Sequence, residues 1–220
     1  MKIISVIPVL NNKSFENLNG FSILSYSIAI SKLSDINECY IVTNFDKSIE
    51  FVKKYNVSLV KIFKENLSEK ESLTKVATEN KLNQDDLIVL LNPMIPKRQP
   101  KIIKNAIKYF KMYYETRDSL RSIQEIKTLP SKYVKINKNV LKPYIKKSND
   151  NLEKIYIPNK YIDIIKVSSL SKSDFYGLAQ FPYIINSNNE IKNEEDLEYC
   201  KWKMNNENNI LLKYLKEMEK

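Results

Sequence analysis

The sequence contains no histidine among its 220 residues. This absence excludes Ser-His-Asp and Cys-His triads, zinc sites with histidine ligands, and acid–base catalysis by imidazole. The two cysteines, Cys39 and Cys200, lie far apart in apolar-periodic segments, and we expect both to be buried, reduced thiols. Two cysteines cannot complete a structural zinc site.

Long hydrophobic runs are also missing. No apolar stretch approaches the length of a membrane span, so we expect no membrane partner. The N-terminal segment becomes polar too early for a signal peptide and has no small-residue cleavage site. We therefore expect a soluble cytoplasmic protein. Its length suits a single domain, residues 1–220, and its 43% hydrophobic content is enough for a core.

The charge balance is basic, with 36 Lys and Arg against 26 Asp and Glu and a net charge of +10. Such a balance accompanies binding of nucleic acid or of anionic substrates. The lysines are scattered through every segment, and no aromatic stripe alternates with them. This distribution argues against nucleic acid as the partner.

Short apolar runs alternate with amphipathic segments in the first half of the chain. The expected strands are 2–9, 39–44, 58–63 and 86–93, and the expected helices are 22–34, 47–56, 68–82 and 100–115. Ser68 and Glu71 have the spacing of a capping box at the start of the expected helix 68–82. Pro100 is favourable in the first turn of the expected helix 100–115. The alternating order predicts an α/β fold, a three-layer α/β/α sandwich with a mainly parallel sheet.

From about Ser119 the pattern becomes strand-like, and the run 155–167 is interrupted by Pro158. Residues 130–170 form either an extension packed on the main sheet or a dimer arm. The segment 193–218 predicts a terminal helix or helix pair, with Asn193 as its cap.

Four stretches, in order, resemble the motifs of one enzyme family. They are 6–9 together with 18–33, then 39–57, 87–107 and 190–200. The third is similar to a V-L-L-Q-P-T-S-P-L-R segment, and the fourth to a D-I-D-T-x-E-D-L signature. The chain thus resembles the CMP-acylneuraminate (sialic acid) synthetases, a family that includes the CMP-Kdo synthetases, over most of its length except 130–170.

The resemblance implies a nucleotide-diphospho-sugar transferase-like fold and a cytidylyltransferase of sialic acid biosynthesis. Such enzymes join CTP to a nonulosonic or ulosonic acid and release pyrophosphate. The sugar hydroxyl attacks the α-phosphate, so the protein mainly positions reactants and neutralises charge. The resemblance also implies CTP or a CMP-sugar and an acidic sugar as ligands, Mg²⁺ as cofactor, and a homodimer.

The loop after the first strand reads P-A-R-G-G-S-K in the family. Here Leu10 stands at the arginine position, Asn11 and Asn12 stand at the glycines, and Lys13 and Ser14 follow. Asparagine tolerates positive φ, so part of a backbone phosphate cradle is expected to remain. The resemblance implies that all five of these loop residues belong to the nucleotide site and that Lys13 is a catalytic cation. The alternative is an ordinary polar loop.

Three further residues fall on positions near the ligands of the family. Asn92 occupies the glutamine position, and Ser72 matches a serine beside the nucleotide. Arg98 matches the arginine of P-L-R and is the second candidate catalytic residue, because guanidinium forks onto a carboxylate or phosphate. Its alternative is a surface arginine before a helix.

The D-I-D pair falls on Glu190 and Lys192. Two carboxylates one residue apart on a strand share a face and can hold one Mg²⁺. Glu190 is therefore the candidate metal ligand, whereas an ammonium at 192 opposes a divalent cation. The alternative is that Lys192 itself supplies positive charge near the phosphates.

Two functional hypotheses follow. The first is a sugar nucleotidyltransferase. The second is a non-catalytic descendant that binds a sugar nucleotide or a protein partner, because the arginine and a lysine of the family loop and an aspartate of its signature are replaced. Fold similarity cannot choose between them, since function depends on the site.

Overall fold

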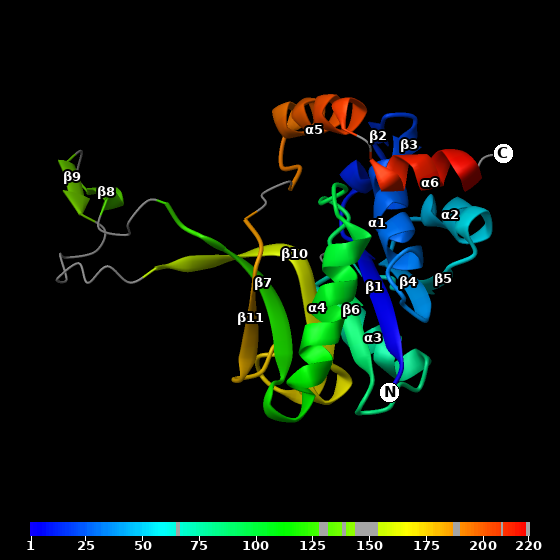
Figure 1. Ribbon diagram of the computed structural model, residues 1–220, viewed down its shortest axis with the longest axis horizontal. Helices are drawn as coiled ribbons and strands as arrows, with labels where there is room; N and C mark the ends of the chain where they lie inside the picture. The colour runs from blue at the N-terminus through cyan, green and yellow to red at the C-terminus, as the bar shows by residue number, and fades with distance from the viewer. Residues whose placement is uncertain are drawn as a thin grey trace.

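The computed structural model describes residues 1–64, 67–127, 132–137, 140–143, 154–186, 190–207 and 209–218. Seven strands form its main sheet: β1 (Ile3–Val9), β4 (Glu38–Thr43), β5 (Ser58–Lys61), β6 (Leu87–Leu90), β7 (Ser119–Glu125), β10 (Tyr156–Lys166) and β11 (Gln180–Ile184). Their order across the sheet is β11-β7-β10-β6-β1-β4-β5 (Figure 1). The strands expected at 2–9, 39–44, 58–63 and 86–93 are confirmed as β1, β4, β5 and β6.

The sheet is mainly parallel, as the alternating pattern predicts. Strand β1 pairs in parallel with both β4 and β6, and β4 with β5. Strand β10 runs antiparallel to both β6 and β7, and β11 is parallel to β7. The reversed strand β10 therefore lies between the parallel strands β6, β1, β4 and β5 on one side and β7 and β11 on the other.

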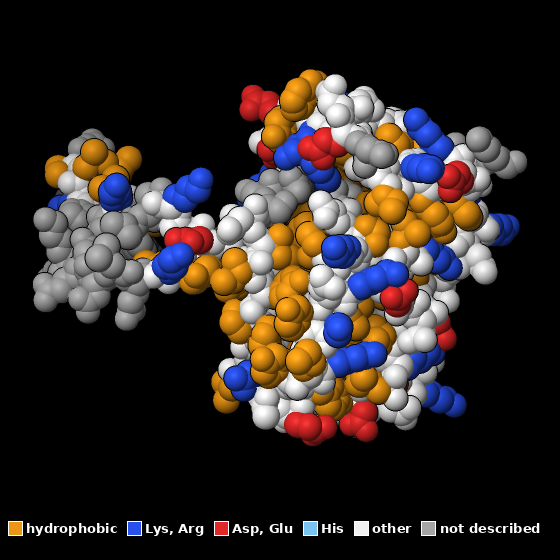
Figure 2. Space-filling view, viewed as in Figure 1, with side chains coloured by type: hydrophobic (Ala, Val, Ile, Leu, Met, Phe, Trp, Pro, Cys, Tyr) orange, Lys and Arg blue, Asp and Glu red, His pale blue; other side chains and the backbone are white. Residues whose placement is uncertain are grey.

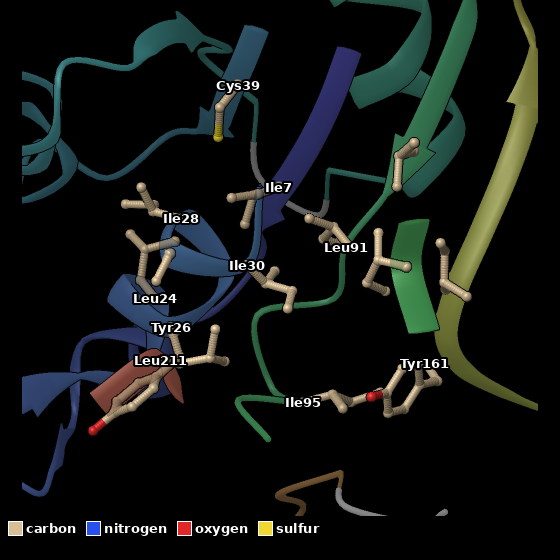
Figure 3. Packing of buried hydrophobic residues seen from close by; sticks show 14 of the residues in the cluster. Ile7, Leu24, Tyr26, Ile28, Ile30, Cys39, Leu91, Ile95, Tyr161 and Leu211 are labelled. Atoms are coloured by element: carbon tan, nitrogen blue, oxygen red, sulfur yellow. The ribbon is translucent and has the colours of Figure 1, made fainter. Parts of the chain in front are cut away.

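The described residues contain six α-helices: α1 (Ile23–Lys32), α2 (Ser48–Tyr55), α3 (Glu69–Glu79), α4 (Pro100–Met112), α5 (Glu194–Asn206) and α6 (Ile210–Met218). Helix α3 packs on one face of the sheet, in a cluster with Ile4, Val6 and Ile88. On the other face the buried side chains of α1, α4, α5 and α6 join one large cluster, part of which is drawn in Figure 3. The three-layer sandwich is confirmed.

Local sequence signals explain where several helices begin. The Ser68 side chain accepts from the Glu71 N–H, and the Glu71 carboxylate accepts from the Ser68 N–H, which completes the expected capping box. Asn193 and Asp196 form a second capping box at α5. Pro100 occupies the first turn of α4, where its missing donor costs nothing.

Strand β10 continues through Pro158 rather than ending there. Its register against β7 shifts between Pro158 and Asp163, and Lys160 within this bulge has a positive φ of 57°. The bulge places both Tyr161 and Ile162 in the large cluster, whereas Asp163 lies on the α3 face with Tyr176. A bulge re-aims side chains because it adds residues to one strand only, and here β10 runs from Pro158 to Asp163 while β7 runs only from Ile123 to Arg121.

A hairpin of β8 (Val134–Asn137) and β9 (Val140–Pro143) projects from the sheet between β7 and β10 (Figure 1). It falls in the expected extension 130–170, of which residues 130–131, 138–139 and 144–153 lie outside the described residues. Within that range, Tyr156–Lys166 belongs to the main sheet, as β10. Among the described helices, none has the length and apolar character needed to traverse a bilayer.

The thiols of Cys39 and Cys200 are buried and not joined in a disulfide, as the sequence predicts. Burial raises the pKa of both thiols, that of Cys200 to about 11. Neither thiol is therefore an activated nucleophile.

Candidate functional site

The carboxyl ends of β1 and β6 form the candidate site. After β1 the chain continues to β4 on one side, while β6 lies on the other side of β1. Ligands of open α/β sheets bind at such a switch point, in the crevice outside the carboxyl ends of the strands. The elements that meet here are the loop after β1, the loop after β6, and the segment 190–193 that leads into α5.

The loop after β1 does not have the expected glycine-like backbone. Asn11 is extended with φ −151°, and residues Asn12–Phe15 form the 3-10 turn η1. Neither Asn11 nor Asn12 is among the described residues that have a positive φ. The expectation of left-handed asparagines at the glycine positions is therefore wrong. The reason lies in Phe15, which packs against the rings of Phe45 and Phe51 and thereby fixes the turn.

The side chains of this loop divide into exposed and buried ones. Leu10 is 42% exposed, and Asn11, Asn12 and Lys13 are also exposed. No ion pair joins the Lys13 ammonium to any other described residue. Ser14 is buried, and its Oγ donates to Met94 Sδ at 3.7 Å, which ties this loop to the loop after β6. Lys13 is thus the loop's cation available to a ligand.

Asn92 joins the loop after β6 to the segment before α5. Its Oδ1 accepts from the Met94 N–H at 3.0 Å, and its Nδ2 donates to Glu190 Oε1 at 3.3 Å. The Ile191 N–H donates to the Met94 carbonyl at 2.8 Å. Two of the four motifs found in the sequence, 87–107 and 190–200, therefore meet at one point although 98 residues separate Asn92 from Glu190.

Glu190 has a second partner on its other oxygen. Lys192 Nζ lies 3.5 Å from Glu190 Oε2, with the lysine side chain 65% exposed and the glutamate side chain 24% exposed. The Lys192 N–H donates to Asp196 Oδ2 at 2.9 Å, so the backbone of Lys192 is held by the first turn of α5. Asn92, Glu190 and Lys192 form one connected polar chain.

Arg98 lies in the interior, 2% exposed, and not at an open surface. Its Nε donates to the Tyr161 carbonyl at 2.7 Å, and its two terminal nitrogens donate to acceptors on three elements. These are the Asn92 carbonyl at 2.9 Å, the Lys160 carbonyl at 3.5 Å, Ser27 Oγ at 3.3 Å and the Ile95 carbonyl. Burial lowers the pKa of Arg98 to about 10, which leaves it a cation at neutral pH.

The geometry of Arg98 differs from both sequence interpretations, the anion-binding fork and the surface arginine. All its nitrogens donate to protein acceptors, so it holds the loop after β6 against β10 rather than contacting a ligand. Ser72 also differs from the expectation. It is fully buried in the first turns of α3, and its Oγ donates to the Ser68 carbonyl at 3.0 Å. Because this hydrogen bond lies within α3, the hydroxyl points to the Ser68 carbonyl and not toward the candidate site.

The donors around Glu190 do not fit Mg²⁺. This ion takes oxygen ligands in octahedral geometry, usually with one or two carboxylates. Within the described residues, no group of three or more His, Cys, Asp or Glu side chains lies close enough to hold a metal. The side-chain oxygen of Asn92 already accepts from the Met94 N–H, and its nitrogen donates to Glu190. The Lys192 ammonium lies beside the second oxygen of Glu190, where it repels a cation.

A buried ionic cluster borders the site, and the sequence interpretation missed it. Asp163 is 3% exposed and lies opposite Leu90, the last residue of β6. Tyr176 Oη donates to Asp163 Oδ2 at 3.0 Å, and Arg121 Nε lies 3.9 Å from Asp163 Oδ1. The Arg121 guanidinium stacks on the Tyr176 ring at 3.7 Å. The signal that could have found this cluster is a lone carboxylate inside the apolar run 161–167.

Burial raises the pKa of Asp163 to about 6, although Arg121 and Tyr176 oppose the rise. Between about pH 4 and about pH 6 the folded protein keeps a proton that the unfolded chain releases. The contribution of this group to the unfolding free energy therefore decreases as pH rises through that window. Asp163→Asn cannot ionise, and we expect it to be about 1–2 kcal/mol more stable than the parent at neutral pH.

Urea unfolding at a series of pH values measures this effect. The stability difference between Asp163→Asn and the parent should be small at the acid end and should grow to a plateau above the pKa. Asp35→Asn, whose parent side chain is 75% exposed, is the matched control and should show no such growth. A difference that is constant with pH would contradict the raised pKa.

Comparisons with known proteins agree on the fold. The structure of a CMP:2-keto-3-deoxy-manno-octonic acid synthetase complexed with CTP superposes with a TM-score of 0.71, 13% identity, and coverage of 93% of this chain and 99% of that chain. The 2-C-methyl-D-erythritol 4-phosphate cytidylyltransferase of Francisella tularensis gives 0.68, 14%, 93% and 100%. A putative glucose-1-phosphate thymidylyltransferase from Bacillus anthracis gives 0.63, 12%, 94% and 96%.

No family model matches the sequence, and no curated protein matches it. The structural likenesses are below 15% identity, so they concern the backbone arrangement and not the site. Each spans nearly the whole of both chains. The chain therefore has the fold of the nucleotidyltransferases to which it is similar.

Proposed function

We propose that this protein binds a cytidine nucleotide at the carboxyl edge between β1 and β6 and acts as a cytidylyltransferase on an acidic sugar. The single observation that carries the proposal is the Asn92–Glu190 contact. It brings together two motifs that resemble those of CMP-acylneuraminate synthetases, at the switch point of the sheet. The similar fold of a synthetase complexed with CTP supports the same ligand class.

In the proposed reaction a sugar hydroxyl oxygen attacks the α-phosphorus of CTP. The bond from that phosphorus to the bridging oxygen breaks, pyrophosphate leaves, and the hydroxyl proton passes to solvent. The Lys13 ammonium is placed to neutralise the triphosphate, because it is the exposed cation of the loop after β1. Arg98 acts as a positioning residue, since it binds the carbonyl of Asn92.

The second candidate function is a binding protein without turnover. The observation that favours it is the exposed Leu10 at the position of the family's arginine. Removing one preorganised donor to a developing charge typically lowers turnover by about 10²–10³. A site with fewer such donors still binds a nucleotide, because the cytosine and sugar contacts need not be charged.

The proposal includes a homodimer built through the β8–β9 hairpin. The hairpin exposes four apolar side chains, Val134, Ile136, Val140 and Leu141, which are 55–75% accessible. They gather on the projecting part of the molecule at the left of Figure 2. A two-stranded hairpin is marginally stable alone, so a second copy that covers these side chains would stabilise it.

Thermal unfolding with a panel of nucleoside triphosphates and CMP-sugars, followed by a pyrophosphate-release assay on each hit, tests the function. A ligand at about 100 times its Kd stabilises the folded state by about 2.7 kcal/mol, or roughly 5–10 °C for a chain of this size. We expect such a shift for CTP and a smaller one for ATP, GTP and UTP.

A shift with pyrophosphate release supports the transferase, and a shift without release supports the binding protein. Equal shifts for all four triphosphates would contradict the preference for cytosine. Absence of any shift would contradict both candidate functions.

A further inference from the structure

The polar chain formed by Asn92, Glu190 and Lys192 is the feature of the site that differs most from a metal centre. Each oxygen of the Glu190 carboxylate has its own partner. The Asn92 amide donates to Oε1 at 3.3 Å, and the Lys192 ammonium lies 3.5 Å from Oε2. The negative charge of Glu190 is thus already balanced by a positive charge of the protein.

The amide of Asn92 cannot turn to offer its oxygen to a cation without losing both of its contacts. Its oxygen accepts from the Met94 N–H, and its nitrogen faces Glu190. The two contacts together fix the amide orientation, because exchange of the oxygen and nitrogen would place like partners against each other. The second oxygen ligand that Mg²⁺ would need here is therefore turned away.

The backbone of Lys192 is held in position on both sides. The Ile191 N–H donates to the Met94 carbonyl, and the N–H groups of Lys192 and Asn193 donate to Asp196 Oδ2. The side chain beyond this fixed backbone is 65% exposed, so the ammonium remains accessible. Among the residues that the structure describes, Glu190 is the partner of this ammonium, so two of its three N–H groups can donate to another anion.

We infer that the Lys192 ammonium takes the place of the divalent cation, so that this protein binds a nucleoside triphosphate without Mg²⁺. The inference rests on the proposed function. An ammonium is a compact point charge that binds phosphate oxygens well. Together with Lys13, it brings two ammonium groups to the carboxyl edge between β1 and β6, and Glu190 offsets one of these two positive charges.

Calorimetric titration of the full chain with CTP, once in EDTA and once with excess Mg²⁺, tests the inference. We expect the two dissociation constants of the parent to agree within about twofold, a difference of about 0.4 kcal/mol. Lys192→Ala should weaken binding in EDTA by about tenfold or more, because one charge-assisted contact is lost.

Lys192→Asp gives the sharper result, since it places carboxylates at both 190 and 192. This variant should bind CTP poorly in EDTA and should recover by about tenfold or more when Mg²⁺ is added. The matched control is Lys108→Asp, the same charge change on the exposed face of α4. It should bind like the parent in both buffers. The unfolding temperature of each variant identifies any that is misfolded.

Three outcomes would overturn the inference. A strict Mg²⁺ requirement in the parent would do so and leave the proposed function standing. Unchanged affinity of a folded Lys192→Ala protein in EDTA would do so as well. If CTP bound neither in EDTA nor with Mg²⁺, the proposed function would be overturned and this inference with it.

Discussion

Replacing Arg98 with alanine is expected to lower the unfolding free energy by about 4 kcal/mol. The guanidinium donates to carbonyls of the loop after β6 and of β10, and the substitution removes these donors, although the Asn92 carbonyl still accepts from the Ile95 N–H at 3.2 Å. Each buried acceptor left unsatisfied costs about 1–3 kcal/mol, and the space vacated by the side chain adds to the loss. The midpoint and slope of urea unfolding measure the effect.

Two variants make this result specific. Arg98→Lys keeps the charge but has a single nitrogen, which cannot reach acceptors on both β10 and the loop, so we expect an intermediate loss. Arg117→Ala removes an arginine whose guanidinium donates to the neighbouring Thr116 carbonyl at the surface, and it should change stability by less than about 1 kcal/mol. If Arg98→Ala were as stable as the parent but bound CTP weakly, Arg98 would have to be a ligand contact.

Lys13→Ala is expected to weaken CTP binding by about 10–100-fold, because a hydrogen bond to a charged group contributes about 1.5–3 kcal/mol. Stability should not change, since the side chain is exposed and has no ion pair within the described part of the chain. Isothermal titration with CTP, CDP and CMP measures the effect. The loss should be largest for the triphosphate if the ammonium contacts the outer phosphates.

The control for Lys13 is Lys108→Ala, which removes the same charge from the exposed face of α4. It should leave all three affinities unchanged, apart from a small general effect of net charge that added salt removes. An equal loss for CTP and CMP in Lys13→Ala would place this lysine near the nucleoside and contradict its proposed role.

Much of the fold could be predicted because local signals and burial agree in the first half of the chain. The run at 86–93 is apolar because β6 is buried on both faces, and Ser68 marks a helix start because its side chain closes the first turn. Strand direction is different. An apolar run is the same in either direction, so nothing in 156–166 indicates that β10 enters the sheet reversed.

The site was only partly predictable, for physical reasons that concern particular residues. The family resemblance assigned Asn92 and Glu190 to the same site, and the two side chains are in contact. The burial of Arg98 could not be seen, because the segment P-K-R-Q-P is typical of a surface and the acceptors are backbone carbonyls of β10, more than 60 residues later. The turn at Asn12 follows from the packing of Phe15, which is a tertiary effect.

The reversed strand β10 has a consequence for how a change in one part of the sheet reaches the candidate site. Its bulge supplies the Lys160 and Tyr161 carbonyls to Arg98, and its last residues pair with β6. Arg98 in turn donates to the Asn92 carbonyl. A displacement of the bulge is therefore transmitted to the backbone of Asn92 through a single side chain.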